Sequence, residues 1–459
     1  MIEHFDAIVI GTGQAGPPLA VRLAGAGRKT AIIERKHFGG TCVNNGCIPT
    51  KTLIASARAA WVARNADRYG VALGGPVRVE MPKVKARKDE VVTQSTNSIE
   101  SWLRGTPNVT VLEGQARFES AEVVRVGEQR LTAPQIFINT GGRPTVPAFE
   151  GLENVDYLTS TSMMDVEFLP EHLIVIGGSY IGLEFAQMYR RFGSRVTVIE
   201  MAPRLIARED EAVSQAVREI LEGEGIGVRL NAPCIAVQKH PGGVAVQVSC
   251  QQEPRTIVGS HLLLAVGRAP NTDDLGLDRA GVVTDARGFI VVDDQLATSV
   301  PGIFALGDVN GRGAFTHTSY NDYEIVASNL LDNESRRVSD RFPVYALFTD
   351  PPLARAGMTE REARASGRRI LVGHRPMARV GRARERGETQ GFMQVLVDAE
   401  TQRILGAALL GIEADEAIHC IIDVMNARAP YTAIRRAVHI HPTVAELIPT
   451  LLSEIAPLQ

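Results

Sequence analysis

The 459-residue sequence has few cysteines, no long apolar run and no marked excess of either charge. Five cysteines are too few for a disulfide-stabilised scaffold, so a reducing, cytoplasmic compartment is expected. The longest apolar runs, such as 262–266, are far shorter than the roughly 20 residues that cross a bilayer. The first residues lack the basic stretch and the small-residue cleavage site of a secretory signal. Neither secretion nor a membrane span is therefore expected.

The charged residues are nearly balanced, with 49 basic against 52 acidic side chains and a formal net charge of −3. Neither sign forms a long block, so we expect no nucleic-acid partner and no anionic-membrane partner. A hydrophobic fraction of 44% with 22% charged residues is typical of a globular protein. At about 150 residues per domain, the length predicts roughly three domains.

A dinucleotide-binding pattern lies close to the N-terminus. The apolar run Ala7–Ile10 leads into a glycine turn at Gly11, Gly13 and Gly16, and an Ala/Leu-rich stretch and a second apolar run ending at Glu34 follow. Glycines let backbone amides approach a pyrophosphate at the start of a helix, and an acid at the end of the second strand accepts hydrogen bonds from ribose hydroxyls. The pattern predicts a βαβ unit that binds a dinucleotide.

The same pattern returns in the middle of the chain. The run Leu173–Ile176 precedes Gly177, Ser179 and Gly182, and the next apolar run ends at Glu200. Serine replaces the middle glycine and still leaves a small side chain under the phosphates. Because a carboxylate repels a 2′-phosphate, Glu200 favours NADH. NADPH stays possible, since two arginines lie close to this acid in the sequence.

Two similar strand-and-glycine segments, Phe137–Pro144 and Leu264–Asn271, are expected where the chain crosses between domains. The C-terminal part alternates apolar and polar residues and ends in an apolar helix expected at Pro442–Leu452. The fold class predicted is α/β with two Rossmann-like domains and a C-terminal α+β domain. The predicted limits are 1–145 with 270–335 for the first, discontinuous domain, 146–269 for the second and 336–459 for the third.

Two cysteines, Cys42 and Cys47, have four residues between them and lie just after the first nucleotide-binding unit. Pro49 is tolerated in the first turn of a helix, so Cys47 is expected at a helix N-terminus, where the dipole favours a thiolate. A zinc site would need two further Cys or His at a suitable spacing, and none follows, so no metal site is predicted. The remaining cysteines are interpreted as buried structural thiols: Cys234, Cys250 and Cys420.

These features, in this order and over the whole chain, resemble the flavin-dependent pyridine nucleotide-disulfide oxidoreductases, the group of dihydrolipoamide dehydrogenase, glutathione reductase and mercuric reductase. The resemblance implies FAD in the first site, NADH or NADPH in the second, and a C-terminal dimerisation domain. The residues implied at FAD are Gly11, Gly13, Gly16, Glu34, Gly40, Thr41, Lys51, Thr140, Gly141, Gly307 and Asp308. Those implied at NAD(P)H are Gly177, Ser179, Tyr180, Gly182, Glu200 and Gly267.

The resemblance also implies roles next to the flavin. Lys51 matches the lysine beside flavin N5, with Glu184 as its ion-pair partner, where a fixed cation stabilises charge on the reduced ring. Tyr180 matches the aromatic gate over the isoalloxazine. Cys47 matches the thiolate that contacts the flavin, and Cys42 the thiol that attacks the substrate.

Near the C-terminus, the segment 441–446 resembles the family's His-Pro-Thr-x-x-Glu motif. The resemblance implies that His441 is the acid-base group and that Glu446 orients it. Both residues act from the opposite subunit in the family, so a homodimer with a shared active site is implied. His439, two residues earlier, is interpreted as structural.

The acceptor is expected to be a small molecule: a disulfide, a metal ion or an oxidant. The segments 48–51 and 315–326 look most like the bacterial reactive-chlorine-resistance flavoproteins, whereas 439–443 echoes dihydrolipoamide dehydrogenase. Mercuric reductases typically end in a vicinal cysteine pair, which this C-terminus lacks. The contacts that a glutathione reductase makes with its peptide substrate cannot be placed in this sequence. Two hypotheses of another class are a flavin oxidase that needs no disulfide and a non-catalytic subunit of a larger complex.

Overall fold

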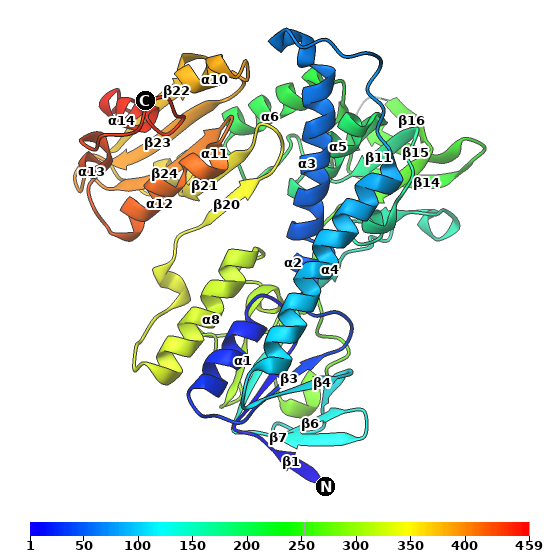
Figure 1. Ribbon diagram of the computed structural model, residues 1–459, viewed down its shortest axis with the longest axis vertical. Helices are drawn as coiled ribbons and strands as arrows, with labels where there is room; N and C mark the ends of the chain where they lie inside the picture. The colour runs from blue at the N-terminus through cyan, green and yellow to red at the C-terminus, as the bar shows by residue number, and fades with distance from the viewer. Residues whose placement is uncertain (251–252, 459) are drawn as a thin grey trace.

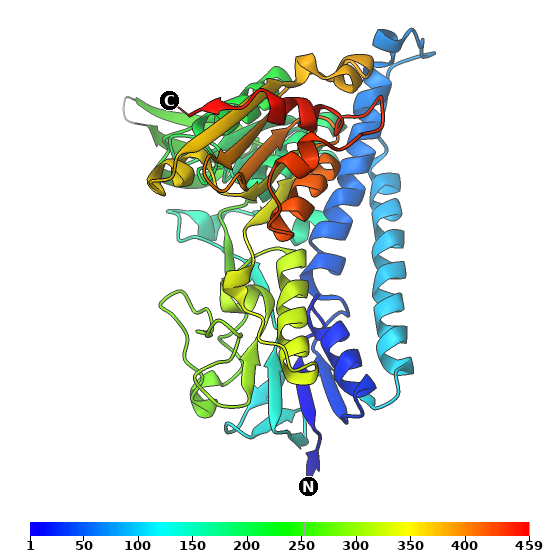
Figure 2. The ribbon, with the colours of Figure 1, turned by 90° about the vertical axis from the view of Figure 1, so that its left-hand side faces the viewer.

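The computed structural model describes residues 1–250 and 253–458. In Figure 1, the first domain lies at the bottom, the second at the upper right and the C-terminal domain at the upper left. Two long antiparallel helices, α3 (Cys47–Arg64) and α4 (Met81–Gly105), lie side by side and run from the bottom domain towards the top (Figures 1 and 2). Helix α3 therefore connects the first domain to the level of the other two.

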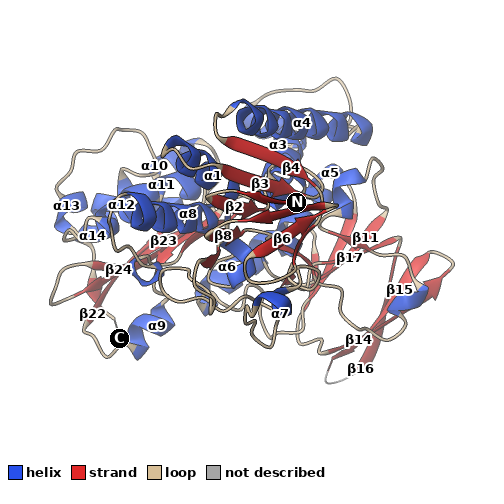
Figure 3. Cartoon of the chain, turned by 90° about the horizontal axis from the view of Figure 1, so that it is seen from below, coloured by secondary structure: helices blue, strands red, loops and turns tan. Residues whose placement is uncertain are grey.

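The first domain is built on a parallel five-stranded sheet in the order β19-β8-β2-β3-β4. Its strands are β2 (Ala7–Ile10), β3 (Thr30–Glu34), β4 (Val109–Glu113), β8 (Gln135–Ile138) and β19 (Ile303–Ala305). Helices α1 (Gly16–Gly25) and α8 (Thr316–Leu331) pack against each other beside these strands (Figure 3). Every residue of β2 is buried, as a strand covered on both faces requires.

The second domain repeats this arrangement in the order β10-β17-β11-β12-β13, again parallel. Its elements are β10 (Leu158–Thr159), β11 (His172–Ile176), α5 (Tyr180–Phe192), β12 (Arg195–Ile199), α6 (Glu211–Gly223), β13 (Gly227–Arg229) and β17 (His261–Leu264). A three-stranded antiparallel sheet is added at β14 (Cys234–His240), β15 (Gly243–Cys250) and β16 (Glu253–Gly259). The expected pair of Rossmann-like domains is confirmed.

The C-terminal domain is a six-stranded antiparallel sheet in the order β20-β21-β24-β23-β22-β25. Its strands are β20 (Val344–Leu347), β21 (Leu353–Gly357), β22 (Ile370–Pro376), β23 (Phe392–Asp398), β24 (Ile404–Leu410) and β25 (Ala456–Pro457). Its helices are α9 (Glu360–Ala365), α10 (Gly381–Glu385), α11 (Ala414–Ala417), α12 (His419–Asn426), α13 (Thr432–Arg435) and α14 (Leu447–Ser453). A mixed α and β domain was expected here.

The helix expected at Pro442–Leu452 begins later than predicted, because α14 starts at Leu447. The Thr443 hydroxyl donates to the Ile440 carbonyl at 2.8 Å and accepts from the Glu446 amide at 3.2 Å. These local bonds satisfy the backbone in a turn and compete with a helical hydrogen-bond pattern. The prediction was therefore wrong for the first turn of the proposed helix.

The remaining elements complete the first domain and its crossing to the second. They are β1 (Ile2–His4), α2 (Gly40–Asn44), β5 (Ala116–Phe118), β6 (Val123–Val126), β7 (Gln129–Thr132), β9 (Gly142–Pro144), β18 (Arg268–Pro270) and α7 (Leu277–Ala280). The β9–β18 ladder lies within the two expected crossing segments. The exact domain limits stay a prediction. Within 1–250 and 253–458, no helix is both long and apolar enough to span a bilayer.

Candidate functional site

The first glycine turn is too crowded for any side chain. Gly11 has a φ of +103°, and a Cβ there would lie 2.4 Å from the Asn139 carbonyl oxygen. A Cβ on Gly16 would lie 2.2 Å from the carbonyl oxygen of Gly11, and one on Gly40 would lie 2.9 Å from Cα of Gly13. The result is a cradle of bare backbone at the N-terminus of α1, which fits the diphosphate of a dinucleotide such as FAD.

Glu34 is held at this turn in the position expected for a ribose-binding acid. Its carboxylate accepts hydrogen bonds from the Thr12 amide at 3.1 Å and from the amides of Arg35 at 2.8 Å and Lys36 at 2.9 Å. The Thr12 hydroxyl donates to it as well, at 2.5 Å. These contacts fix the carboxylate at the end of β3, next to the turn.

Asn139 organises the turn, although the sequence did not single it out. Its side-chain oxygen accepts from the Gly16 amide at 3.0 Å, and its amide group donates to the Leu306 carbonyl at 2.9 Å. The residue therefore ties the glycine turn to the segment that holds Gly307 and Asp308. Its position at the end of an apolar strand, just before a glycine pair, was the available signal.

Two further segments expected at FAD lie around this turn. The Gly307 amide donates to Asp322 at 2.8 Å, and burial raises the pKa of the neighbouring Asp308 carboxyl, with Arg268 opposing the rise. Arg268 also donates to the Thr41 hydroxyl at 3.3 Å. On the far side, the Thr140 hydroxyl donates to the Asn271 carbonyl at 2.8 Å, and Gly141 has a φ of +65°.

The second glycine turn likewise leaves no space for a side chain at its first and last glycines. A Cβ on Gly177 would lie 2.3 Å from the Ala265 carbonyl oxygen, and one on Gly182 would lie 2.0 Å from the Gly177 carbonyl oxygen. Ser179 directly precedes the first residue of α5. Gly267, also expected here, has a φ of +128° and follows β17.

Glu200 closes this turn from the end of β12. Its carboxylate accepts from the Gly178 amide at 2.6 Å and from the Ala202 amide at 2.8 Å. Glu34 and Glu200 thus occupy equivalent positions in the two domains, each bound to backbone amides beside a glycine turn. This geometry suits a carboxylate that accepts hydrogen bonds from ribose hydroxyls.

The two cysteines of the pair are adjacent and differ in acidity. Cys42 lies on α2, Cys47 is the first residue of α3, and both are free thiols in this structure. A hydrogen bond from Cys42 lowers the pKa of Cys47 to about 6, with Thr316 and Lys51 acting in the same direction and burial against it. The same hydrogen bond, together with burial, raises the pKa of Cys42. At neutral pH the reduced pair is therefore a Cys47 thiolate that accepts a hydrogen bond from the Cys42 thiol.

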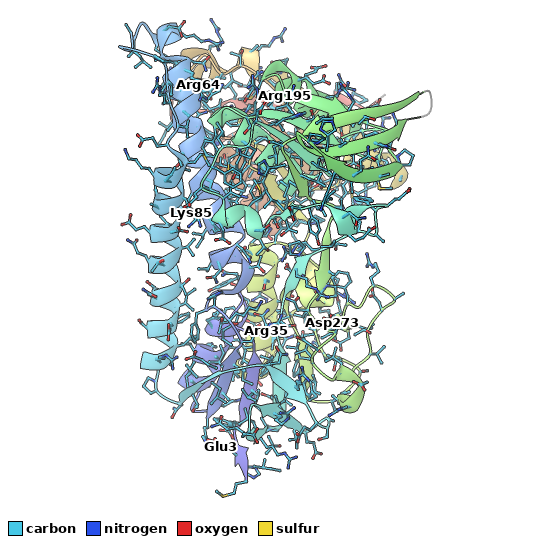
Figure 4. All side chains as sticks on the ribbon, turned by 90° about the vertical axis from the view of Figure 1, so that its right-hand side faces the viewer. Glu3, Arg35, Arg64, Lys85, Arg195 and Asp273 are labelled. Carbon is cyan, nitrogen blue, oxygen red and sulfur yellow. The ribbon has the colours of Figure 1, made fainter. Side chains whose placement is uncertain are left out.

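Lys51 and Glu184 form the expected ion pair one helical turn from Cys47. Lys51 Nζ lies 2.8 Å and 3.0 Å from the two carboxylate oxygens of the buried Glu184. The Phe348 amide also donates to Glu184 at 3.0 Å. Helices α3 and α5 pack together along this seam, and Arg64 at the upper end of α3 donates to the Phe192 carbonyl at 3.3 Å (Figure 4).

Thr316 is a site residue that the sequence did not reveal. It is the first residue of α8, and its hydroxyl lies 3.2 Å from the Cys47 sulfur. When the sulfur is ionised, the hydroxyl is the donor, and it stabilises the thiolate. The segment 315–326 was noted only for its resemblance, and no local pattern connects Thr316 to Cys47.

Replacing Thr316 with valine is expected to raise the pKa of Cys47, because a hydrogen bond to a charged sulfur is lost. The pH midpoint for alkylation of Cys47 by iodoacetamide should rise by about one pH unit. Measuring it in a Cys42→Ser background leaves one reactive thiol of the pair. The matched control is Thr52→Val, because the Thr52 hydroxyl donates to the Ile48 carbonyl on the same helix as Cys47. Equal midpoints for Thr316→Val and Thr52→Val would contradict the assignment.

His441 and Glu446 form the expected dyad on the C-terminal domain. His441 Nδ1 lies 2.9 Å and 3.1 Å from the two Glu446 carboxylate oxygens. The histidine side chain is 79% exposed, whereas the glutamate is largely covered. The hydrogen bond at Nδ1 orients the ring and leaves Nε2 free to exchange a proton. Within the described part of the chain, the one hydrogen bond of His439 is long, at 3.4 Å from its Nδ1 to the Ala437 carbonyl.

Of the three cysteines outside the pair, the structure describes the side chain of Cys420. Cys420 is half-buried beside the C-terminal core rather than fully buried, so its interpretation as a buried thiol was only partly right. The side chains of Cys234 and Cys250 lie outside the described part. Among the residues that the structure describes, no group of three or more His, Cys, Asp or Glu side chains could hold a metal ion.

Comparison with known proteins covers nearly the whole chain. The family described as "Pyridine nucleotide-disulphide oxidoreductase" matches residues 5–322, and its dimerisation domain matches 344–452. The Escherichia coli K12 protein named "Probable pyridine nucleotide-disulfide oxidoreductase RclA" is 38% identical, over 98% of this chain and 99% of RclA. The dihydrolipoyl dehydrogenase of Thermus scotoductus is 35% identical, over 97% of this chain and 96% of that protein. The mercuric reductase of Streptomyces lividans is 33% identical, over 99% and 98%.

A solved structure has the same fold throughout. The Cu(II) complex of the HOCl-induced flavoprotein disulfide reductase RclA from Escherichia coli superposes with a TM-score of 0.89 at 37% identity, covering 99% of each chain. The family's dimerisation domain indicates that the assembly is a homodimer. The chain therefore belongs to the pyridine nucleotide-disulphide oxidoreductases, FAD-dependent enzymes that take electrons from NAD(P)H and pass them through a cysteine pair.

Proposed function

We propose that Cys42 and Cys47 are the redox pair of this enzyme and that its acceptor is Cu(II) or a small disulfide. The observation that carries the proposal is the unequal acidity of the two thiols, with the pKa of Cys47 lowered to about 6 and that of Cys42 raised. Bound FAD would supply the two-electron redox chemistry that links NAD(P)H to the sulfur pair. The glycine cradle, Glu34 and Asp308 would hold it, and Lys51 would place a fixed positive charge beside it.

The reduced pair can reduce a disulfide in two balanced steps. Cys42 loses its proton and attacks one sulfur of the acceptor, so a mixed disulfide forms and one thiol leaves. The Cys47 thiolate then attacks Cys42, which closes the internal disulfide and releases the second half of the acceptor as a thiolate that takes a proton from water. One acceptor disulfide thereby becomes two thiols for each pair of electrons stored.

Proton transfer in these steps falls to His441. Its exposed ring would face the cysteine pair of the partner subunit, which supports an active site shared across the dimer. Nε2 would take the proton from Cys42 and return it to the leaving thiolate, while Glu446 holds Nδ1. Imidazole suits this task because it gains and loses a proton close to neutral pH.

The choice between NADH and NADPH is assigned to Glu200. Its carboxylate lies at the end of β12, bound to the amides of Gly178 and Ala202, where a 2′-phosphate would meet a negative charge. We therefore propose NADH as the preferred donor, with Tyr180 at the start of α5 covering the nicotinamide side of the site.

Cu(II) is the favoured acceptor because RclA, a structural relative, has been solved as a Cu(II) complex. Two Cu(II) ions would accept one electron each, so the Cys47 thiolate and the Cys42 thiol return to the disulfide and release the one proton of Cys42. The FAD-loaded enzyme with NADH should be tested against Cu(II), glutathione disulfide, lipoamide, Hg(II), a quinone and oxygen. The proposal expects the highest kcat/KM for Cu(II) or a disulfide. Faster turnover with the quinone or oxygen would instead support the oxidase hypothesis.

A further inference from the structure

A buried ion pair joins the second nucleotide domain to the C-terminal sheet. Glu209 and Arg355 have side chains that are 0% and 1% exposed. Arg355, on β21, donates from Nε to Glu209 at 3.0 Å and from Nη2 to both Glu209 and Asp210. A fully buried pair of this kind is costly to break and is held in one geometry by several hydrogen bonds.

The second carboxylate oxygen of Glu209, which Arg355 does not contact, is bound to Tyr345. The hydroxyl of Tyr345, on β20, donates to Glu209 Oε1 at 2.7 Å. Burial and the nearby carboxylate both raise the pKa of Tyr345, so the hydroxyl stays protonated as a donor. The ring of Tyr345 is therefore fixed at its hydroxyl end by the buried pair.

Tyr345 in turn packs against Tyr180. The two rings meet edge to face with centroids 5.6 Å apart, and the hydroxyl of Tyr180 is buried. On its other side, Tyr345 stacks on Phe315 at 5.6 Å. Tyr180 is the first residue of α5, directly after the second glycine turn. It lies one helical turn before Glu184, so it shares the helix face that carries the contact to Lys51.

The loop that carries Glu209 also contacts the nucleotide turn itself. The amide of Ile206 donates to the Gly178 carbonyl at 2.8 Å, and Leu205 lies directly against Gly178. Glu209 is thus fixed both to the glycine turn of the second domain and to the C-terminal sheet. Tyr345 is held relative to the nucleotide site, although it belongs to a different domain.

We propose that Tyr345 is a positioning residue that holds Tyr180 in place over the nicotinamide half of NAD(P)H, with the Glu209–Arg355 pair as its anchor. This inference rests on the proposed function of the second nucleotide site. The described side-chain contacts of Tyr345 are with Glu209, Tyr180 and Phe315, so its effect on the nucleotide site passes through Tyr180. Replacing Tyr345 should weaken the binding of the nicotinamide half and leave the binding of the adenosine half unchanged.

The test uses the full-length, FAD-loaded protein and the variant Tyr345→Phe, which removes one oxygen. Anaerobic stopped-flow reduction by NADH should give a dissociation constant about fivefold higher than that of the wild type, less than the loss of a direct hydrogen bond to a charged group would cause, because the effect passes through Tyr180. Calorimetric binding of ADP-ribose should stay within about twofold of the wild type, since it lacks nicotinamide. The matched control is Tyr189→Phe, which removes a hydroxyl from a buried tyrosine on the same helix as Tyr180.

A double-mutant comparison separates positioning from a general loss of structure. In a Tyr180→Ala background, adding Tyr345→Phe should cause no further loss of NADH affinity. Unchanged NADH binding in Tyr345→Phe would overturn the inference, and so would an equal weakening of NADH and ADP-ribose. If wild-type protein bound neither ligand, the proposed function would fail instead.

Discussion

Replacing Cys42 with serine is expected to lower NADH-dependent turnover by a factor on the order of 10³ or more, the scale seen when a covalent nucleophile is removed. The variant keeps Cys47 but loses the thiol that attacks the acceptor. The Cys42–Cys47 disulfide then cannot form, so the pair cannot pass two electrons to the acceptor. Steady-state kcat with Cu(II) and with a disulfide acceptor measures the effect. Cys47→Ser should be equally severe, because the thiolate whose pKa is lowered to about 6 is then absent.

The control for both variants is Cys420→Ser, which removes a half-buried thiol outside the pair. It should leave turnover within about twofold of the wild type, as is usual for a substitution away from special features. Equal turnover for Cys42→Ser and wild type would reject the dithiol mechanism and favour an oxidase that reduces oxygen or a quinone directly. Negligible turnover of the wild type with every acceptor would favour a subunit of a larger complex.

Replacing His441 with glutamine is expected to lower turnover with a disulfide acceptor by about 10²- to 10⁴-fold, the usual contribution of a general acid–base group. Glutamine has a similar size but cannot carry the proton from Cys42 to the leaving thiolate. With Cu(II), no leaving thiolate needs a proton, so the loss should be much smaller. Measuring kcat with both acceptors on the same preparation separates the two cases.

His439→Gln is the matched control for this variant, since it changes the same residue type two positions earlier in the same segment. Among the described residues, the ring of His439 makes one long hydrogen bond, so turnover with either acceptor should hardly change. An equal loss for His439→Gln and His441→Gln would argue against the assignment of the acid–base role to His441. Because the dyad is proposed to act on the partner subunit, an inactive His441→Gln chain should regain activity when mixed into heterodimers with Cys42→Ser chains.

The glycine turns could be predicted from the sequence because each position has a local physical cause. Gly11 and Gly177 adopt a positive φ beneath a neighbouring strand, and no other residue type fits the space. The spacing of Cys42 and Cys47 and the proline at position 49 likewise indicated a cysteine at a helix N-terminus, which α3 confirms. Where the chain alone sets the geometry, its pattern was enough.

The contacts made between distant segments could not be predicted in this way. Thr316 lies 269 positions from the Cys47 that it contacts, and Tyr345 lies 136 positions from Glu209. Helix α8 returns to the first domain from a late part of the chain, and β20 of the C-terminal domain packs against the second domain, which brings these pairs together. The late start of α14 has a different, local cause, because the Thr443 side chain satisfies the backbone in a turn and the apolar pattern does not record this.

The most direct test of the account counts thiols in the FAD-loaded enzyme before and after anaerobic titration with NADH. The oxidised enzyme is treated with a maleimide, then reduced with NADH and labelled with a second maleimide, and the labelled peptides are identified by mass spectrometry. Two new thiols per chain are expected, located at Cys42 and Cys47, together with a long-wavelength absorbance that appears with them. Reduction of the bound FAD by NADH without new label at either cysteine would contradict it.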